Sequence, residues 1–318
     1  MDTAMHDAMH PVTQHGPFVR PRTTSSPLAE MADRQIDARS RLTTLGRDLR
    51  NSRGVMIGGS LFLAVVVIAI AAPMIARYNP IDQDYGQTLR PPNLEHLMGT
   101  DNFGRDIFSR VVFGTQISLR VGLISVAIAS LIGIPLGLVA GYYGRWIDGV
   151  AMGLIDIMLA FPGILLAFVI VAVVGSSLVN LMIAIGIGSI PGFARLIRGS
   201  VLSTRALSYV EAARVIGCRD PRIVGLHILP NIASPIIVYS TLKVATAILA
   251  GASLSFLGLG VQRPTPEWGV MLADGRNFLQ QQWWIAAFPG LAIMVTTLAI
   301  NLLGDGIRDI HDPRLQRG

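Results

Sequence analysis

The sequence is poor in charge and in the residues that carry most enzyme chemistry. Only 14% of the 318 residues are charged, against roughly a quarter in a soluble domain. There is a single cysteine, Cys218, which excludes a disulfide within the chain. There is also a single lysine, Lys243, and it has no glycine frame around it. The chain therefore lacks a nucleotide-binding P-loop, which needs Gly-x-x-x-x-Gly-Lys-[Ser/Thr] so that the lysine reaches the terminal phosphates.

Other catalytic motifs are missing as well. The sequence contains neither the His-Glu-x-x-His motif of zinc proteases nor the Gly-x-Ser-x-Gly motif of serine hydrolases. A catalytic thiol at Cys218 would need a histidine held beside it as a base. His227 could take this role only if the fold happened to bring it there. A membrane enzyme is thus a weakly supported alternative, and we expect no catalytic residue, no metal site and no nucleic-acid partner.

Long hydrophobic runs are what the sequence has in abundance. Half of the residues are hydrophobic (51%). A helix of about 20 residues crosses a bilayer. The run at residues 149–194 is therefore long enough for two spans, with residues 175–180 as the turn between them. The pattern predicts an all-α, polytopic membrane protein with six transmembrane helices. The runs that lack formal charge, apart from Asp156 in the third and Lys243 in the fourth, are residues 54–76, 121–144, 149–194, 223–262 and 277–304.

Residues 1–50 differ in composition from the rest of the chain. They contain scattered proline, serine, histidine and arginine and no apolar stretch, which is unlike a signal peptide. We expect a disordered cytoplasmic tail. His6, His10 and His15 lie in it, but their spacing in a flexible segment fixes no metal geometry.

The arginines near the ends of the spans predict the orientation. Segments rich in arginine usually remain in the cytoplasm. With six spans, the N-terminal tail, the segment between spans four and five and the C-terminal segment share one side, which is therefore the cytoplasm. Residues 77–116 and 261–283 are then external, although Arg105, Arg110 and Arg120 make the first of them imperfectly neutral. Trp268, Trp283 and Trp284 fit an external interfacial belt. The arginines counted on the cytoplasmic side are Arg39, Arg41, Arg47, Arg50 and Arg53, then Arg195, Arg198, Arg205, Arg214, Arg219 and Arg222, and finally Arg308, Arg314 and Arg317.

A polar segment, residues 208–230, lies between two of the apolar runs on this cytoplasmic side. Ser208 and Glu211 have the spacing of a capping box, which predicts the start of a short helix. Gly217 can adopt the left-handed conformation that ends such a helix. Asp220 followed by Pro221 predicts a second helix, with Asp220 as its N-cap, that runs towards Leu229 and Pro230. We expect a helix, an elbow and a helix.

The spacing within this elbow is also that of a known motif. Glu211, Ala212 and Ala213, followed by Gly217 and then by Leu229-Pro230, resemble the "EAA" loop of type I ABC importer permeases. The sequence His-Ile-Leu-Pro-Asn is similar to the variant of the peptide and nickel branch, although the general pattern has isoleucine where this chain has His227. The resemblance implies that these six residues form a coupling helix that inserts into a cleft of an ATPase subunit.

Three further stretches resemble the same branch, at residues 98–110, 254–276 and 304–315. The resemblance covers the chain from about Asn51 onward and is closest to the C-type subunit of dipeptide or oligopeptide importers. It implies an inner-membrane location, a B-type permease partner, two ATPase subunits that hold ATP and magnesium, and an external substrate-binding protein. This chain itself would hold no cofactor. One departure is Gly251 in "AILAGASLSFLGLG", where relatives carry an acidic residue.

The resemblance divides the chain into four parts. Residues 1–50 form the tail, 51–116 the first span and an external segment, 117–306 the core permease domain, and 307–318 a cytoplasmic C-terminal tail. A channel or an ion-coupled secondary transporter is the alternative function. Such a protein would be expected to have several ionisable residues within the membrane, and this chain has chiefly Asp156 and Lys243.

Four sequence features outside the elbow lead to structural expectations. Gly133, Gly137 and Gly141 form a stripe that lets a neighbouring helix approach closely, whereas Pro135, Pro162 and Pro191 are expected to kink their helices. Asp156 and Lys243 have similar predicted depths, roughly 15 and 18 Å from the cytoplasmic ends of their spans, so they could form an intramembrane pair. Pro264, Pro266 and Trp268 could dock the binding protein, or Trp268 could anchor the chain in the bilayer.

Overall fold

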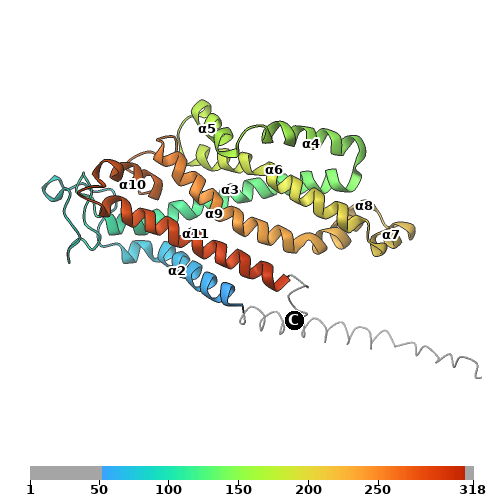
Figure 1. The fold of residues 1–318 in the computed structure, drawn as a ribbon, viewed down its shortest axis with the longest axis horizontal. Helices are drawn as coiled ribbons and strands as arrows, with labels where there is room; N and C mark the ends of the chain where they lie inside the picture. Colours follow the sequence, from blue (N-terminus) through green and yellow to red (C-terminus); the bar gives the residue numbers. More distant parts are fainter. Residues whose placement is uncertain (1–51, 312–318) are drawn as a thin grey trace, which may run out of the picture. The chain divides into compact units, whose positions relative to one another are not determined.

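The structure is a computed structural model, and it describes residues 52–311. Within this range the ordered elements are helical, and the only strand-like pairing is an isolated bridge between Thr100 and Asp106. The predicted all-α class is therefore confirmed for the described residues. The α-helices, coloured along the chain in Figure 1, are α2 (Arg53–Ile75), α3 (Ile107–Tyr143), α4 (Arg145–Leu159), α5 (Gly163–Val174), α6 (Leu178–Arg205), α7 (Ser208–Val215), α8 (Asp220–Ile223), α9 (Ala233–Phe256), α10 (Trp268–Gly275) and α11 (Trp284–His311).

The helices account for six membrane spans. Five helical stretches in the described range are long and apolar enough to cross a bilayer, and the pair α4 and α5, bent by 81°, makes the sixth. Pro162 lies at this bend, directly before α5. The turn predicted at residues 175–180 is present but shorter, because α5 ends at Val174 and α6 already begins at Leu178.

Helix α3 is longer than predicted. It begins at Ile107, where the Asp106 side chain accepts a hydrogen bond from the Ser109 amide, and not at Val121. Its first turns contain Arg110 and Arg120, which interrupt the uncharged run that was used to predict the span. The predicted boundary between residues 116 and 117 therefore falls inside a helix, and the external segment before α3 is residues 76–106. The predicted boundary at 306 likewise falls inside α11.

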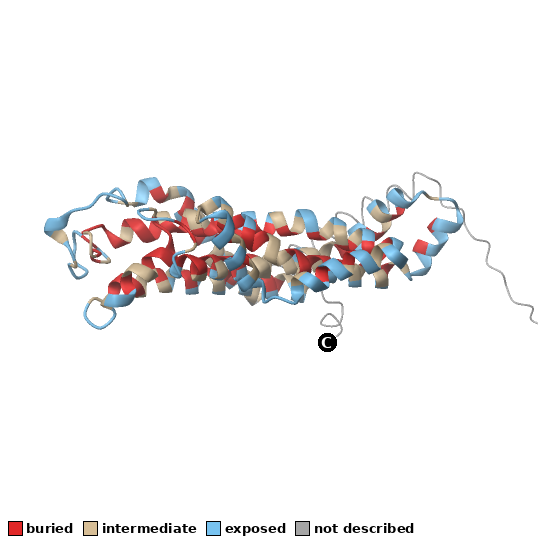
Figure 2. Ribbon diagram, turned by 90° about the horizontal axis from the view of Figure 1, so that it is seen from above, coloured by how far each residue is buried: buried red, intermediate tan, exposed pale blue. Residues whose placement is uncertain are grey.

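Close packing of α3 on α6 depends on the predicted glycine stripe. A Cβ added at Gly133 would lie 2.6 Å from the Cβ of Phe193, and one added at Gly137 would lie 2.5 Å from the Ala194 carbonyl oxygen. At Gly141 the added atom would lie 2.8 Å from the Cβ of Val201. The packing role predicted for the stripe is thus confirmed. The buried residues lie along these contacts between helices in Figure 2.

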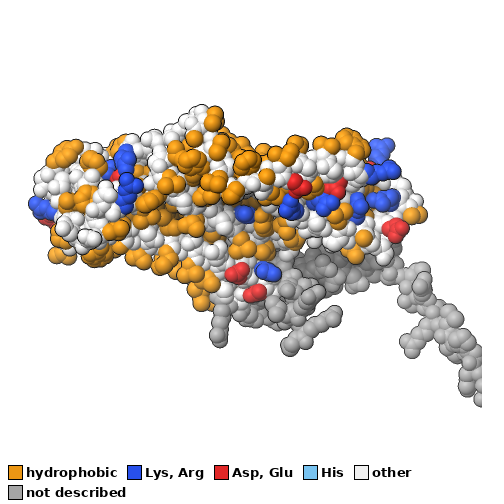
Figure 3. All heavy atoms as spheres, turned by 45° about the horizontal axis from the view of Figure 1, so that its top comes forward, with side chains coloured by type: hydrophobic (Ala, Val, Ile, Leu, Met, Phe, Trp, Pro, Cys, Tyr) orange, Lys and Arg blue, Asp and Glu red, His pale blue; other side chains and the backbone are white. Residues whose placement is uncertain are grey.

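The outward surface of the helices is apolar. On α2, for example, Ile70 is 76% exposed and Met74 is 89% exposed. Figure 3 shows hydrophobic side chains over much of the helices and basic side chains towards both ends, with more of them near the end that carries α7 and α8. This distribution is that of a chain whose middle faces lipid or other apolar helices and whose ends face water.

Candidate functional site

The elbow is a compact helical turn at the end of α6. Helix α7 ends as predicted, because Gly217 has a φ of +82°. The Gly217 amide donates to the Arg214 carbonyl and the Cys218 amide to the Ala213 carbonyl, both at 3.0 Å. These two hydrogen bonds form a Schellman motif, in which a left-handed residue closes the helix end.

The predicted capping box is wrong. The N-cap of α7 is Leu207, and no side chain caps the helix start. Residues 206 and 207 alone separate α6 from α7, so the helix already includes Ser208, and the Leu207 carbonyl accepts from the Val210 amide at 2.9 Å. Ser208 therefore lies one position too late to act as the cap.

The second helix of the elbow continues into span five. Pro221 lies in its first turn as predicted, but the N-cap is Arg219 and not Asp220. The helix does not stop at Leu229 and Pro230. A π-helical segment (Val224–Ile228) and a 3₁₀ segment (Leu229–Ile232) carry it into α9, giving one helical stretch from Asp220 to Phe256. The changes of helical pitch accommodate the missing amide hydrogen of Pro230 without a break.

The elbow is fixed to the ends of α3 and α6 by buried and polar contacts. The Tyr142 hydroxyl donates to Asp220 at 2.7 Å, and Arg205 donates to the carbonyls of Gly141 and Tyr142 at 2.8 and 2.9 Å. A cation at this position is favourable because the C-terminal carbonyls of α3 carry partial negative charge. A hydrophobic cluster lies beneath the elbow and contains Tyr142, Ile197, Val201, Val210, Ala213, Ile223, Ile228 and Ile232.

One face of the elbow remains exposed. Glu211 and Ala212 lie on it, whereas Ala213 is only 5% exposed and packs inward, so only one of the two alanines can offer a small surface to a partner. Val215 and Ile216, which the motif did not single out, are 82% and 79% exposed at the tip. Leu229 and Pro230 are also exposed. Two apolar side chains in water at a helix tip indicate a contact surface.

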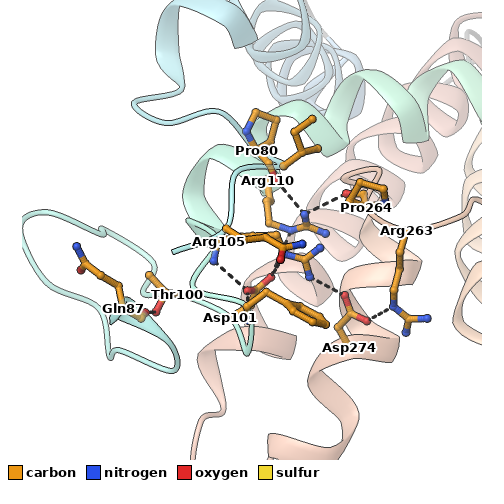
Figure 4. A network of polar contacts seen from close by, with 12 residues as sticks. Pro80, Gln87, Thr100, Asp101, Arg105, Arg110, Arg263, Pro264 and Asp274 are labelled. Carbon is orange, nitrogen blue, oxygen red and sulfur yellow. Dashed lines mark hydrogen bonds and ion pairs between the residues drawn. The ribbon is translucent and has the colours of Figure 1, made fainter. Parts of the chain in front are cut away.

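The opposite end of the helices holds a buried network of ion pairs (Figure 4). Arg105 binds Asp101 at 2.6 Å and Asp274 at 3.1 Å, and its side chain is 1% exposed. Arg110 donates to the carbonyls of Pro80 and Pro264, and Arg263 binds Asp274 from the surface at 2.6 Å. The network joins the segment before α3 to α10. It also explains why a segment predicted to be external contains Arg105 and Arg110, because both arginines are buried beside carboxylates within the fold.

The tryptophans expected at the external interface are mostly buried. Trp268 is 1% exposed, and its indole nitrogen donates to the Val111 carbonyl at 3.0 Å. Its predicted roles as a docking residue and as a bilayer anchor are therefore both wrong, since it is a core residue that packs against Gly114. Trp284 is buried too, and only Trp283 is more than half exposed. Of the two prolines, Pro266 is buried and Pro264 is exposed.

The predicted pair of Asp156 and Lys243 is not formed. Asp156 accepts from Arg195 of α6 at 2.6 Å. Lys243 projects from α9 over the ring of Tyr239, with its nitrogen 5.3 Å from the ring centre. Similar depths do not make a pair when the helix that carries Asp156 is bent away from the rest of its span. Gly251, on another face of α9, packs against Val121.

The remaining sequence predictions concern histidines and metals. His6, His10 and His15 and the rest of the N-terminal tail lie outside the described residues. Within residues 52–311 no group of three or more His, Cys, Asp or Glu side chains is placed to hold a metal ion.

Membrane spans with an exposed helical elbow at one end define a polytopic membrane protein, and comparisons with known proteins identify its family. The chain belongs to the family of binding-protein-dependent transport system inner membrane components, whose model matches residues 133–317. The N-terminal transmembrane domain of oligopeptide transport permease C matches residues 40–92. This match begins before Asn51, where the resemblance in sequence was expected to start.

Curated relatives agree over most of the chain. A dipeptide transport system permease protein DppC of Alkalihalophilus pseudofirmus is 44% identical and aligns over 96% of this chain and 99% of its own. A glutathione transport system permease protein GsiD of Pectobacterium atrosepticum is 46% identical over 82% of this chain and 88% of its own. The fold is similar to that of a chain of the MetNI methionine ABC transporter in an inward-facing conformation, with a TM-score of 0.51, 19% identity and coverage of 64% of this chain and 97% of that one. The protein is therefore a permease subunit of an ABC importer.

Proposed function

We propose that this chain and a second, B-type permease enclose a path for a peptide through the inner membrane. Two ATPase subunits, which bind ATP and magnesium, supply the energy, and an external binding protein delivers the solute. Both termini and the elbow face the cytoplasm. The peptide assignment is supported by relatives named as dipeptide and glutathione permeases.

The orientation is supported by the environment of the arginines. Arg214, Arg219 and Arg222 are exposed on the elbow, whereas Arg105 and Arg110 at the other end are buried and paired. Exposed arginine is typical of the cytoplasmic side, which favours the elbow end, although Arg77, Arg90 and Arg276 towards the other end are exposed as well.

The observation that carries the mechanism is the continuity of the elbow with span five. Its exposed tip contains Glu211, Ala212, Val215 and Ile216, and its base is one helical stretch from Asp220 through α9. When ATP closes the ATPase dimer, movement of the tip would be transmitted to α9 rather than absorbed by a loop. The path would then change its access from the cytoplasm to the binding protein.

The test compares two exposed apolar residues at opposite ends of the helical bundle. Ile216 is 79% exposed on the elbow, and Leu257 is 62% exposed just after α9. A complex with Ile216→Asp should lose the ATPase subunits on affinity purification and lose uptake, because a carboxylate would be buried in the docking cleft. Leu257→Asp should keep the ATPase subunits. Full retention of the ATPase subunits and of uptake by Ile216→Asp would contradict the proposed docking surface.

A further inference from the structure

Lys243 is a cation in the middle of a membrane helix. It lies near the midpoint of α9, a helix of 24 residues, and is half-buried. Within residues 52–311 it takes part in none of the ion pairs, since Asp156 is paired with Arg195 and the other carboxylates of those pairs belong to the two ends of the bundle. Its neighbour is the aromatic ring of Tyr239. An ionisable residue at this depth is costly to insert and is usually retained for a function.

The Lys243 side chain lines a small cavity between α5, α6 and α9. The cavity has a volume of about 160 Å³, and small residues from all three helices, among them Gly163, Gly188 and Ser189, leave the space for it. Gly188 is held close to α5, since an added Cβ would lie 3.0 Å from the Gly163 carbonyl oxygen. Thr246, one turn after Lys243, also lines the cavity and is exposed, so the cavity reaches the surface of the chain.

We propose that Lys243 binds an anionic group of the transported solute in the path, which in a peptide is the C-terminal carboxylate. This inference rests on the proposed function and adds a recognition site to it. The cavity is too small for a whole peptide but has room for its terminal carboxylate group, and an ammonium group forms strong charge-assisted hydrogen bonds with a carboxylate. Between transport cycles, water and the Tyr239 ring stabilise the ammonium group.

The test uses the complete transporter, with its binding protein, reconstituted in liposomes. Cys218, the only cysteine, is first replaced by serine, and Lys243→Cys is then introduced. Uptake of trialanine should fall about tenfold, as expected for the loss of one hydrogen bond to a charged group. Modification with 2-aminoethyl methanethiosulfonate, which restores an ammonium group, should recover uptake, whereas neutral propyl methanethiosulfonate should not. Trialanine should also slow the modification.

Thr241→Cys is the matched control. Thr241 lies on α9 beside Lys243, but it lines a different cavity with Phe62 and Leu123, so trialanine should not protect it. Equal recovery by the neutral reagent, or no protection of Lys243→Cys, would overturn the proposal. So would a Lys243→Gln complex that loses the partner permease while Lys243→Arg keeps it, because Lys243 would then pair with that subunit. If the unmodified transporter takes up no trialanine, the proposed peptide function itself is wrong, and this inference falls with it.

Discussion

At the scale of single residues, Gly217 ends the elbow helix by its backbone conformation and not by a need for space. Its φ is +82°, and an added Cβ would meet nothing within 4 Å. Gly217→Ala should therefore destabilise the end of α7 by roughly 1 kcal/mol through left-handed backbone strain alone. Gly199→Ala is the control, since Gly199 also has open space but lies within α6 with ordinary helical geometry.

The measurement is amide hydrogen exchange of α7 in the assembled complex. We expect faster exchange in Gly217→Ala than in the parent, together with weaker coupling of ATP hydrolysis to uptake, and no change in Gly199→Ala. Equal exchange in the two variants would show that the φ of Gly217 has no energetic consequence.

Glu267 is a buried carboxyl group whose ionisation should affect α10. It is 2% exposed and caps α10 by accepting from the Val270 amide at 3.0 Å. Burial raises the pKa of this carboxyl above its ordinary value, although the hydrogen bonds of the Gly269 and Val270 amides act against the rise. The folded state therefore favours the protonated form. Its contribution to stability is present at low pH and is lost as pH rises through the raised pKa.

We expect Glu267→Gln to remove this pH dependence, because glutamine keeps a neutral acceptor at the same place. Exchange of α10 amides, corrected for intrinsic rates, should increase in the parent as the pH rises above the ordinary pKa of a glutamate carboxyl, and it should stay level in the variant. Amides of α2 serve as the internal reference. A parent whose α10 exchange does not change with pH would contradict the prediction.

At the scale of elements, the stripe of glycines on α3 sets its distance from α6. Gly137→Ala would place a methyl group 2.5 Å from the Ala194 carbonyl oxygen, so the helices must separate. We expect a loss of about 1–3 kcal/mol, which is typical of overpacking. Gly153→Ala on α4 is the control, because its Cβ would meet nothing. Thermal unfolding in detergent should show a lower midpoint for Gly137→Ala only. An equal fall in both variants would show that the contact with α6 is not the cause, since alanine on its own favours a helix more than glycine does.

The sequence predicted the elements whose cause is local. The turn at residues 175–180, the glycine stripe and the end of α7 at Gly217 follow from short-range patterns of apolar residues and from backbone freedom. The start of α3 was missed because Arg110 and Arg120 interrupt the uncharged run in the sequence, whereas the fold buries Arg110 against Asp101 and against carbonyl oxygens of Pro80 and Pro264. The cap of α7 was misplaced by one residue because the chain leaving α6 fixes where that helix starts.

At the scale of the whole molecule, counting residues along a span gives depth but not direction. Asp156 and Lys243 were expected to pair from depth alone, yet each faces a different neighbour, and the bend between α4 and α5 changes the depth itself. The burial of Trp268 was missed for a related reason. Its partner, the Val111 carbonyl, lies 157 residues away in sequence, and no local pattern identifies such a contact. Contacts between residues distant in sequence thus decide whether a tryptophan is buried in the core or exposed for docking.

The ionic network at the external end joins two segments that are distant in sequence. Because Asp274 binds both a buried and an exposed arginine, the contributions of these two ion pairs to stability can be compared. Asp274 binds Arg105, whose side chain is 1% exposed, and Arg263, whose side chain is 58% exposed. Arg105→Met should cost about 3–5 kcal/mol, because it removes the buried cation that Asp101 and Asp274 share. Arg263→Gln should cost at most about 1 kcal/mol, since water screens an exposed pair.

Both variants are measured by thermal unfolding of the purified complex, together with binding-protein-stimulated ATP hydrolysis. Arg105→Met should lower both the unfolding midpoint and the stimulation, because the external segment before α3 is no longer held against α10. Combining Arg105→Met with Asp274→Asn should do less damage than the sum of the two single changes, since the residues are in direct contact. Strictly additive effects, or an Arg263→Gln variant as unstable as Arg105→Met, would show that burial does not set the strength of this network.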